Sequence, residues 1–172
     1  MKIAFCGPMG SGKTFLKDFI NAKYPNKFYT LSFAKYIKKI AIELFGEKEE
    51  CKNRSLLLQI GKALRDIKSN VFINYTIKQS NNFDHVIIDD ARLADEFIEL
   101  KNNKFKLIQL KISMKLQEER LKNKYINYKD HLQNRCDITE QMIGLIEPDL
   151  VLEVDNEKES MQKLLDFIND NL

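Results

Sequence analysis

The sequence has few of the residues that support metal, redox or disulfide chemistry. Its three cysteines, Cys6, Cys51 and Cys136, are scattered, odd in number and lack the spacing of metal ligands. Neither of the two histidines has an evident partner, so nothing indicates a zinc cluster or a Cys–His nucleophile pair. Unpaired cysteines are typical of a reducing compartment, and we expect a cytoplasmic protein.

Long apolar runs are also absent. No run approaches the ~20 residues needed to span a bilayer, and the first residues read as a strand rather than a signal peptide. A chain of 172 residues with 44% apolar and 31% charged residues suits one soluble domain with a real core. The net charge of +3 is mild and spread along the chain, so we expect neither a nucleic-acid partner nor a membrane partner.

Arginine is scarce among the basic residues. Only five of the 28 are arginine, so each is a candidate for a position that lysine cannot fill. A guanidinium grips phosphate or carboxylate with two parallel hydrogen bonds, whereas an ammonium does not. The alternative for each arginine is a plain surface position. The five are Arg54, Arg65, Arg92, Arg120 and Arg135.

Three of the six glycines lie close together near the start of the chain, in Gly7-Pro8-Met9-Gly10-Ser11-Gly12-Lys13-Thr14. The segment fits G-x-x-x-x-G-K-[ST], follows a short apolar strand and precedes a helical pattern, which is the context of a P-loop. The backbone N–H groups of such a loop bind phosphate. The pattern therefore predicts a nucleoside triphosphate bound by Gly7, Gly10, Ser11, Gly12, Lys13 and Thr14, with Lys13 at the β- and γ-phosphates and the Thr14 hydroxyl on Mg²⁺.

Strand and helix patterns alternate along the chain, which favours an α/β fold with a parallel sheet and helices on both faces. We expect strands at 2–6, 28–31, 86–88, 106–112 and 150–154. We expect helices at 12–22, 33–46, 54–66, 70–79, 92–102 and 157–170. The predicted fold is a P-loop three-layer sandwich with a mostly parallel five-stranded sheet. Residues 1–172 form a single domain, with a helical insert at about 33–80 and a polar, lysine-rich connection, read as a lid, at about 114–140.

Ligands of such sheets bind at the carboxyl ends of the strands. Asp89 and Asp90 end the apolar strand Val86-Ile87-Ile88, which resembles a Walker B strand, and at least one of them is expected to serve Mg²⁺. Either aspartate can instead cap a helix, and both roles can hold at once. Arg92, two residues on, is placed to clamp a second phosphate.

Three more sets of residues are candidates for this site. Glu96 could orient Arg92, accept a hydrogen bond from the substrate or lie on the helix surface. Arg54 and Arg65 are 11 residues apart, or three helical turns, and so share one helix face, as a monophosphate-binding arm or as solvated charge. Arg120 and Arg135 belong to the connection 114–140, which is long enough for a lid that closes over the phosphates, or for a solvated loop.

Four segments together resemble one family. They are Gly7–Thr14, Leu31–Lys38, Leu58–Arg65 and Asp90–Glu96. The sequence here is similar to the deoxynucleoside monophosphate kinases of bacteriophages and related viruses, a branch of the adenylate-kinase-like P-loop kinases. Leu93 and Asp95 depart from the family's D-V-R-F-x-N-E, which has Phe and Asn at these positions.

The resemblance implies transfer of the γ-phosphoryl of ATP to a deoxynucleoside 5′-monophosphate. It implies that Lys13 stabilises the transferred group, that Arg92, Arg65 and Arg54 hold the acceptor phosphate, and that Arg120 and Arg135 close from the lid. Ser32 and Phe33 would border the acceptor pocket, with an aromatic ring stacked on the base, and Lys38 ends the S-F-A-x-x-x-K segment on the same side. It is also compatible with a phage gene product acting in the host cytoplasm. Whether the chain forms a homodimer stays open.

Other functions fit part of this pattern. A kinase of another small phosphorylated acceptor, such as dephospho-coenzyme A or phosphomevalonate, would also use an arginine clamp. A non-catalytic nucleotide-binding protein would keep the P-loop without turnover. A GTPase switch is disfavoured, because no Asn-Lys pair is followed two places later by Asp.

Overall fold

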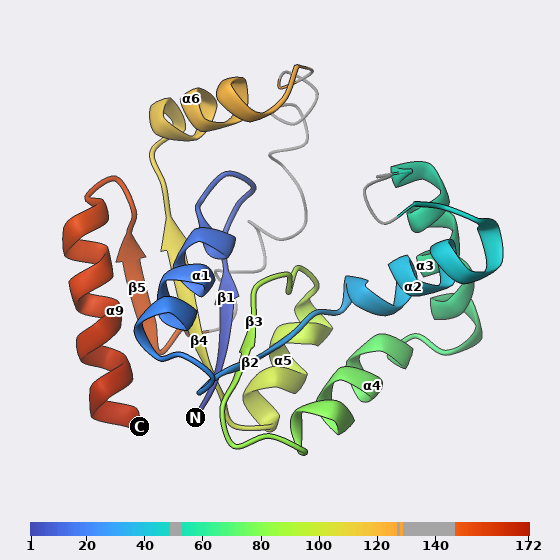
Figure 1. The fold of residues 1–172 in the computed structure, drawn as a ribbon, viewed down its shortest axis with the longest axis horizontal. Coiled ribbons are helices and arrows are strands. Elements are labelled where there is room, and N and C mark those ends of the chain that lie inside the picture. Colours follow the sequence, from blue (N-terminus) through green and yellow to red (C-terminus); the bar gives the residue numbers. More distant parts are fainter. Residues whose placement is uncertain (49–52, 127, 129–146) are drawn as a thin grey trace.

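Five strands form one sheet in the order β2-β3-β1-β4-β5, and every neighbouring pair is parallel (Figure 1). This is a computed structural model, which describes the chain except residues 49–52, 127 and 129–146. The strands are β1 (Lys2–Cys6), β2 (Tyr29–Leu31), β3 (Val86–Ile88), β4 (Phe105–Lys111) and β5 (Leu150–Glu153). The α/β prediction is confirmed, and the sheet is wholly rather than mostly parallel.

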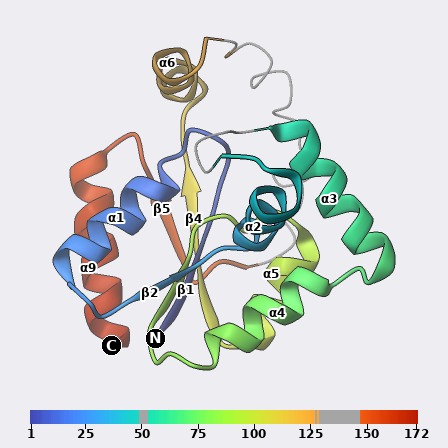
Figure 2. The same ribbon diagram turned by 45° about the vertical axis from the view of Figure 1, so that its right-hand side comes forward.

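Helices cover both faces of the sheet, as the alternation of strand and helix predicts. On one face lie α1 (Lys13–Lys23) and α9 (Glu157–Asn171), and on the other α4 (Val71–Ser80) and α5 (Ala94–Asn102) (Figures 1 and 2). Side chains of a strand alternate between faces. Ile87 therefore joins the core under α1 and α9, whereas Val86 and Ile88 join the core under α4 and α5.

The predicted helical insert contains α2 (Ala34–Phe45) and α3 (Arg54–Ile67), which extend away from the sheet beyond β2 (Figure 1). Gly46 ends α2 with φ of 70°, a left-handed conformation that suits glycine. The Asn53 side chain begins α3 by accepting a hydrogen bond from the backbone N–H of Leu56 at 3.2 Å. The two helices then pack against each other.

The segment after β4 differs from its prediction. The sequence predicts a polar connection from residue 114, but the first part forms α6 (Met114–Lys124), beyond the carboxyl ends of the strands (Figures 1 and 2). Ser113 caps this helix by accepting a hydrogen bond from the Leu116 N–H at 3.3 Å. Its pattern is polar because only Gln117 and Leu121 are buried. Most of the remaining predicted lid, including Arg135, lies outside the described residues.

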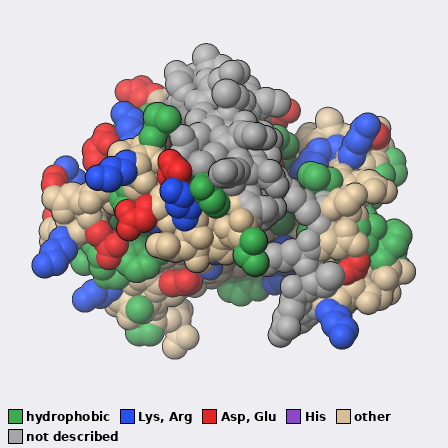
Figure 3. Space-filling view, turned by 90° about the horizontal axis from the view of Figure 1, so that it is seen from above, with side chains coloured by type: hydrophobic (Ala, Val, Ile, Leu, Met, Phe, Trp, Pro, Cys, Tyr) green, Lys and Arg blue, Asp and Glu red, His purple; other side chains and the backbone are tan. Residues whose placement is uncertain are grey.

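Charges of both signs are interspersed on the visible surface above the strand ends (Figure 3). Within the described ranges, none of the helices has the length and apolar character needed to span a membrane.

Candidate functional site

The loop between β1 and α1 has a backbone that only glycine adopts easily. Gly7, Gly10 and Gly12 have φ of 149°, 84° and 96°. A Cβ on Gly7 would lie 2.7 Å from the Leu110 carbonyl oxygen, so β4 leaves no room for a side chain there. The loop therefore takes the tight path that brings backbone N–H groups and the N-terminus of α1 to one place, which is a binding geometry for phosphate.

Lys13 follows this loop as the first residue of α1, and its ammonium group contacts the loop backbone. Its Nζ donates hydrogen bonds to the carbonyl oxygens of Gly7 at 2.7 Å and Pro8 at 2.9 Å. Burial, and secondly the positive charge of Arg92, lower the pKa of Lys13 to about 8. Two cations that destabilise each other in this way are stabilised by an anion bound beside them.

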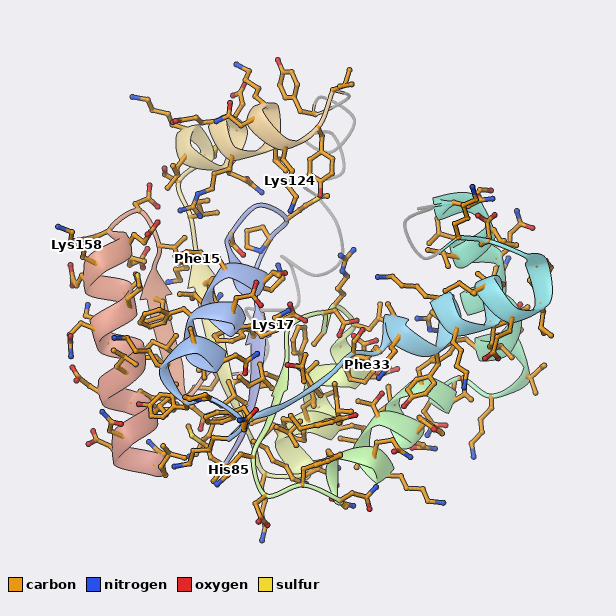
Figure 4. The ribbon with its side chains drawn as sticks, in the orientation of Figure 1. Phe15, Lys17, Phe33, His85, Lys124 and Lys158 are labelled. Atoms are coloured by element: carbon orange, nitrogen blue, oxygen red, sulfur yellow. The ribbon has the colours of Figure 1, made fainter. Side chains whose placement is uncertain are left out.

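Asp89 faces the P-loop from the end of β3. The Thr14 hydroxyl donates to its Oδ2 at 3.0 Å, and Lys17 Nζ lies 3.5 Å from the same oxygen. Figure 4 shows Lys17 on α1 at the side that faces the strand ends. A hydroxyl and a carboxylate oxygen in contact at a phosphate loop are the hard ligands that Mg²⁺ prefers.

Asp90 faces the opposite way and caps α2. Its carboxylate accepts hydrogen bonds from the Ser32 hydroxyl at 2.7 Å, the Phe33 N–H at 3.1 Å and the Ala34 N–H at 2.9 Å. These donors include two backbone groups of the first helical turn, which need a partner. Asp90 therefore takes the capping role and also engages the Ser32 hydroxyl, which leaves Asp89 as the aspartate at the P-loop.

The expectation that Phe33 stacks on a base is wrong for this structure. Phe33 lies where the chain passes from β2 into α2 (Figure 4). Its side chain is only 3% exposed and belongs to the core that includes Ile88 and Phe97. The apolar environment under α4 and α5 takes the ring, and no face of it is left for a ligand.

Glu96 is neither plain helix surface nor a partner of the Arg92 side chain. It is 3% exposed, and its Oε2 accepts hydrogen bonds from the backbone N–H of Arg92 at 2.6 Å and Leu93 at 2.9 Å. Burial raises the pKa of its carboxyl group, and the two backbone donors oppose that rise. Glu96 therefore fixes the backbone from which the exposed Arg92 side chain projects, and the Arg92 guanidinium forms no hydrogen bond or ion pair with a described residue.

Arg65 reaches toward the same region from α3. Its guanidinium carbon lies 5.2 Å from the centre of the Phe72 ring. Its positive charge also acts to lower the pKa of the Glu96 carboxyl group. Gly61, one turn earlier, leaves room for it, because a Cβ there would lie 3.1 Å from Arg65 Nη1. Arg54 begins the same helix, but its side chain is not described, and Lys38 is exposed on α2.

Two side chains of α6 donate hydrogen bonds to backbone carbonyl groups of the P-loop. Arg120 Nη1 donates to the carbonyl oxygens of Gly10 at 3.3 Å and Ser11 at 3.4 Å. Gln117 Nε2 donates to the Met9 carbonyl at 2.8 Å. The sequence does not single out Gln117; Ser113 as a helix cap, followed by polar residues three apart, is the signal that could have found it.

Comparison with models of protein families and with curated proteins gives no match. Solved structures do match along nearly the whole chain. TT1252 from Thermus thermophilus has a TM-score of 0.69 at 14% identity, covering 100% of this chain and 97% of that one. Deoxyadenosine kinase from M. mycoides with bound dATP has a TM-score of 0.60 at 16% identity, covering 98% and 99%. Shikimate kinase from Acinetobacter baumannii in complex with shikimate has a TM-score of 0.60 at 18% identity, covering 99% and 93%. At such identities the likeness shows the fold alone, which the chain shares with these two kinases.

Proposed function

We propose that this protein is an ATP-dependent kinase that transfers the γ-phosphoryl group to a deoxynucleoside or ribonucleoside 5′-monophosphate. The observation that carries the proposal is that Arg92 follows the strand that brings Asp89 to Thr14, and that its exposed positive charge acts on Lys13. The shared fold supports phosphoryl transfer in general. Arg92, as a second cation near the P-loop, supports an acceptor that itself carries a phosphate.

The donor side of the site fits ATP. The N–H groups of the glycine loop and the Lys13 ammonium meet the phosphates, and binding moves Lys13 away from the Gly7 and Pro8 carbonyls that hold it now. Thr14 and Asp89 would hold Mg²⁺, which neutralises charge on the transferring group. Lys17 lies within 3.5 Å of the same Asp89 oxygen and therefore competes with the metal for it.

The acceptor side is formed by arginines from two elements. Arg92 projects from a backbone fixed by Glu96, and Arg65 approaches from α3 along the Phe72 ring. A guanidinium binds a phosphate dianion with two parallel hydrogen bonds. With Lys13 occupied by the ATP phosphates, the exposed Arg92 guanidinium stays available to a second phosphate, that of the acceptor. Arg54 at the start of α3 belongs to this proposed arm, as does Lys38 on α2, at its periphery.

Phosphoryl transfer requires the protein mainly to position the two reactants and to stabilise negative charge. An oxygen of the acceptor phosphate forms a new bond to the γ-phosphorus, and the bond from that phosphorus to the ADP oxygen breaks. Lys13 and Arg92 stabilise the negative charge that moves with the group. Arg120 and Arg135 are proposed to add positive charge from the lid side, for which Arg120 would have to leave the Gly10 and Ser11 carbonyls to which it now donates.

The test is ADP release from Mg·ATP with a panel of possible acceptors. The panel contains the four deoxynucleoside monophosphates, the matching ribonucleotides, dephospho-coenzyme A, phosphomevalonate, deoxyadenosine and shikimate. We expect turnover with at least one nucleoside monophosphate above the acceptor-free background. Turnover only with deoxyadenosine or shikimate would refute the phosphate-bearing acceptor, and silence with every acceptor despite ATP binding would favour a non-catalytic nucleotide-binding protein.

Two variants separate the two sides of the site. We expect Lys13→Ala to abolish turnover with every acceptor. We expect Arg92→Ala to raise the acceptor KM and to lower kcat/KM by roughly 10- to 100-fold, since hydrogen bonds to charged groups contribute about 1.5–3 kcal/mol. Arg92→Lys keeps the charge but loses the fork, and should recover only part of that loss. Unchanged acceptor kinetics in Arg92→Ala would remove Arg92 from the site.

A further inference from the structure

One face of α6 binds three consecutive carbonyl groups of the P-loop. Gln117 takes the Met9 carbonyl, and Arg120 takes those of Gly10 and Ser11. Residues three apart on a helix lie on the same side, so the two side chains act on the loop together. The Gln117 contact is the shorter, at 2.8 Å, and its side chain is buried against the loop.

These contacts fix the orientation of the peptide groups. In a trans peptide the C=O of one residue and the N–H of the next point in opposite directions. When α6 holds the Met9 carbonyl toward itself, the Gly10 N–H turns away from α6, and the Ser11 carbonyl orients the Gly12 N–H in the same manner. No cis bond interrupts the described backbone here. The helix therefore turns the Gly10 and Gly12 N–H groups toward the opposite side, where the phosphates would bind, while the Ser11 N–H donates to the Pro8 carbonyl at 3.2 Å.

The loop sequence matches this partner. Gly10 has φ of 84°, and a Cβ there would lie 3.4 Å from Leu121 Cγ and 3.5 Å from Gln117 Cγ. A side chain at this position would touch α6, so helix and loop lie close together around the hydrogen bond. Since Gln117 is only 5% exposed, its amide has little access to water as an alternative partner. Loss of this hydrogen bond would deprive the Met9 carbonyl of the donor that orients it.

We propose that Gln117 is a positioning residue for the nucleotide phosphates. It acts through the Met9 carbonyl and orients the P-loop N–H groups without touching the ligand. The proposal rests on the proposed function only in that ATP occupies the P-loop, and it is independent of the acceptor.

The test measures binding rather than turnover, so that it stays informative whichever acceptor is used. Mg·ATP and inorganic tripolyphosphate are titrated into the wild type, Gln117→Met and Gln117→Glu, with thermal unfolding of each protein in parallel. Methionine keeps the length of the side chain without the donor, and glutamate keeps its shape but presents an acceptor to the carbonyl. Glu119→Gln, an exposed change on the same helix, is the control.

We expect both Gln117 variants to bind ATP and tripolyphosphate roughly three- to tenfold more weakly, the range for loss of one hydrogen bond. The control should bind as the wild type does. An equal loss of affinity for the two ligands would show that Gln117 acts on the binding of the phosphates, which both ligands contain. A lowered Tm with unchanged dissociation constants would overturn the proposal, as would a loss confined to ATP, because Gln117 would then act on the base or on stability alone.

Discussion

The adjacent carboxylates Asp89 and Asp90 have different partners, which makes Asp89→Asn and Asp90→Asn a matched pair of perturbations. Each exchange removes one negative charge and keeps the size of the side chain. We expect Asp90→Asn to lower the free energy of unfolding and Asp89→Asn to remove metal-dependent turnover. The exposed Asp66→Asn on α3 controls for loss of charge alone.

The cost of Asp90→Asn follows from its three hydrogen bonds. Oδ2 serves the Ser32 hydroxyl and the Ala34 N–H, while Oδ1 serves the Phe33 N–H. An asparagine can keep an oxygen that accepts from the Ser32 hydroxyl and the Ala34 N–H. Its NH₂ group, which is a donor, then faces the Phe33 N–H, which is also a donor. One charge-assisted bond is lost and two are weakened, for a total of about 3 kcal/mol. For a domain of this size that loss lowers Tm by roughly 6–12 °C.

Asp89→Asn should leave stability nearly unchanged. The carboxylate makes one hydrogen bond to Thr14, which the asparagine oxygen can keep, and one ion pair with Lys17 at 3.5 Å, whose loss costs about 1 kcal/mol. Its loss should instead reduce turnover by roughly 100-fold or more, since charge stabilisation by a bound metal ion contributes several kcal/mol to a transition state.

Two measurements decide the matter. Thermal unfolding by circular dichroism gives Tm for the four proteins, and ADP release against MgCl₂ concentration, below the lowest Tm, gives the metal dependence. An unchanged Tm in Asp90→Asn would refute the capping role. Wild-type magnesium dependence and turnover in Asp89→Asn would refute its place at the metal, and equal effects of both variants would refute the division of tasks.

Two other perturbations test the cations of the site. Because the pKa of Lys13 is lowered to about 8 in the free protein, the ammonium is present below that pH and must regain a proton to meet phosphate above it. The dissociation constant of Mg·ATP, measured by titration calorimetry, should be flat below about pH 7.5 and rise by up to about tenfold per pH unit above 8; Lys13→Arg is the control that stays charged, and a flat wild-type profile to about pH 9.5 would contradict the reasoning. Gly61→Ala places a methyl group 3.1 Å from Arg65 Nη1 and 3.3 Å from Ile37 Cδ1, so steady-state kinetics should show a raised acceptor KM and an unchanged ATP KM. Adding Ile37→Val removes only the second contact, and recovery of the acceptor KM in the double variant would reduce the effect to packing.

Much of the fold could be predicted because local patterns agree with it. The buried runs at β1, β3 and β4, the glycine loop and the amphipathic helices each carry their own signal, and their alternation leaves a parallel sheet as the natural arrangement. The P-loop prediction needed no tertiary information, since the loop's phosphate-binding geometry depends on glycines placed close together in the sequence.

Residues whose surroundings come from distant elements were harder to predict. Phe33 and Glu96 lie beside site residues in the sequence, yet both are only 3% exposed. Phe33 joins the core under α4 and α5, and Glu96 turns back to the backbone N–H groups of Arg92 and Leu93. Helix α6 was missed because its buried side faces the P-loop rather than the sheet. Two buried positions, Gln117 and Leu121, give no helical stripe that periodicity could detect.

Asp89 and Asp90 show where the sequence becomes ambiguous. Successive side chains of an extended chain point to opposite faces, so two consecutive acids at a strand end cannot both serve one site. Ile87 faces α1 and α9, and Ile88 faces α4 and α5; the alternation continues, sending Asp89 to Thr14 on α1 and Asp90 to the start of α2. The sequence implies the alternation but not which face carries α1. That depends on β3 lying between β2 and β1, a long-range pairing that no local pattern encodes.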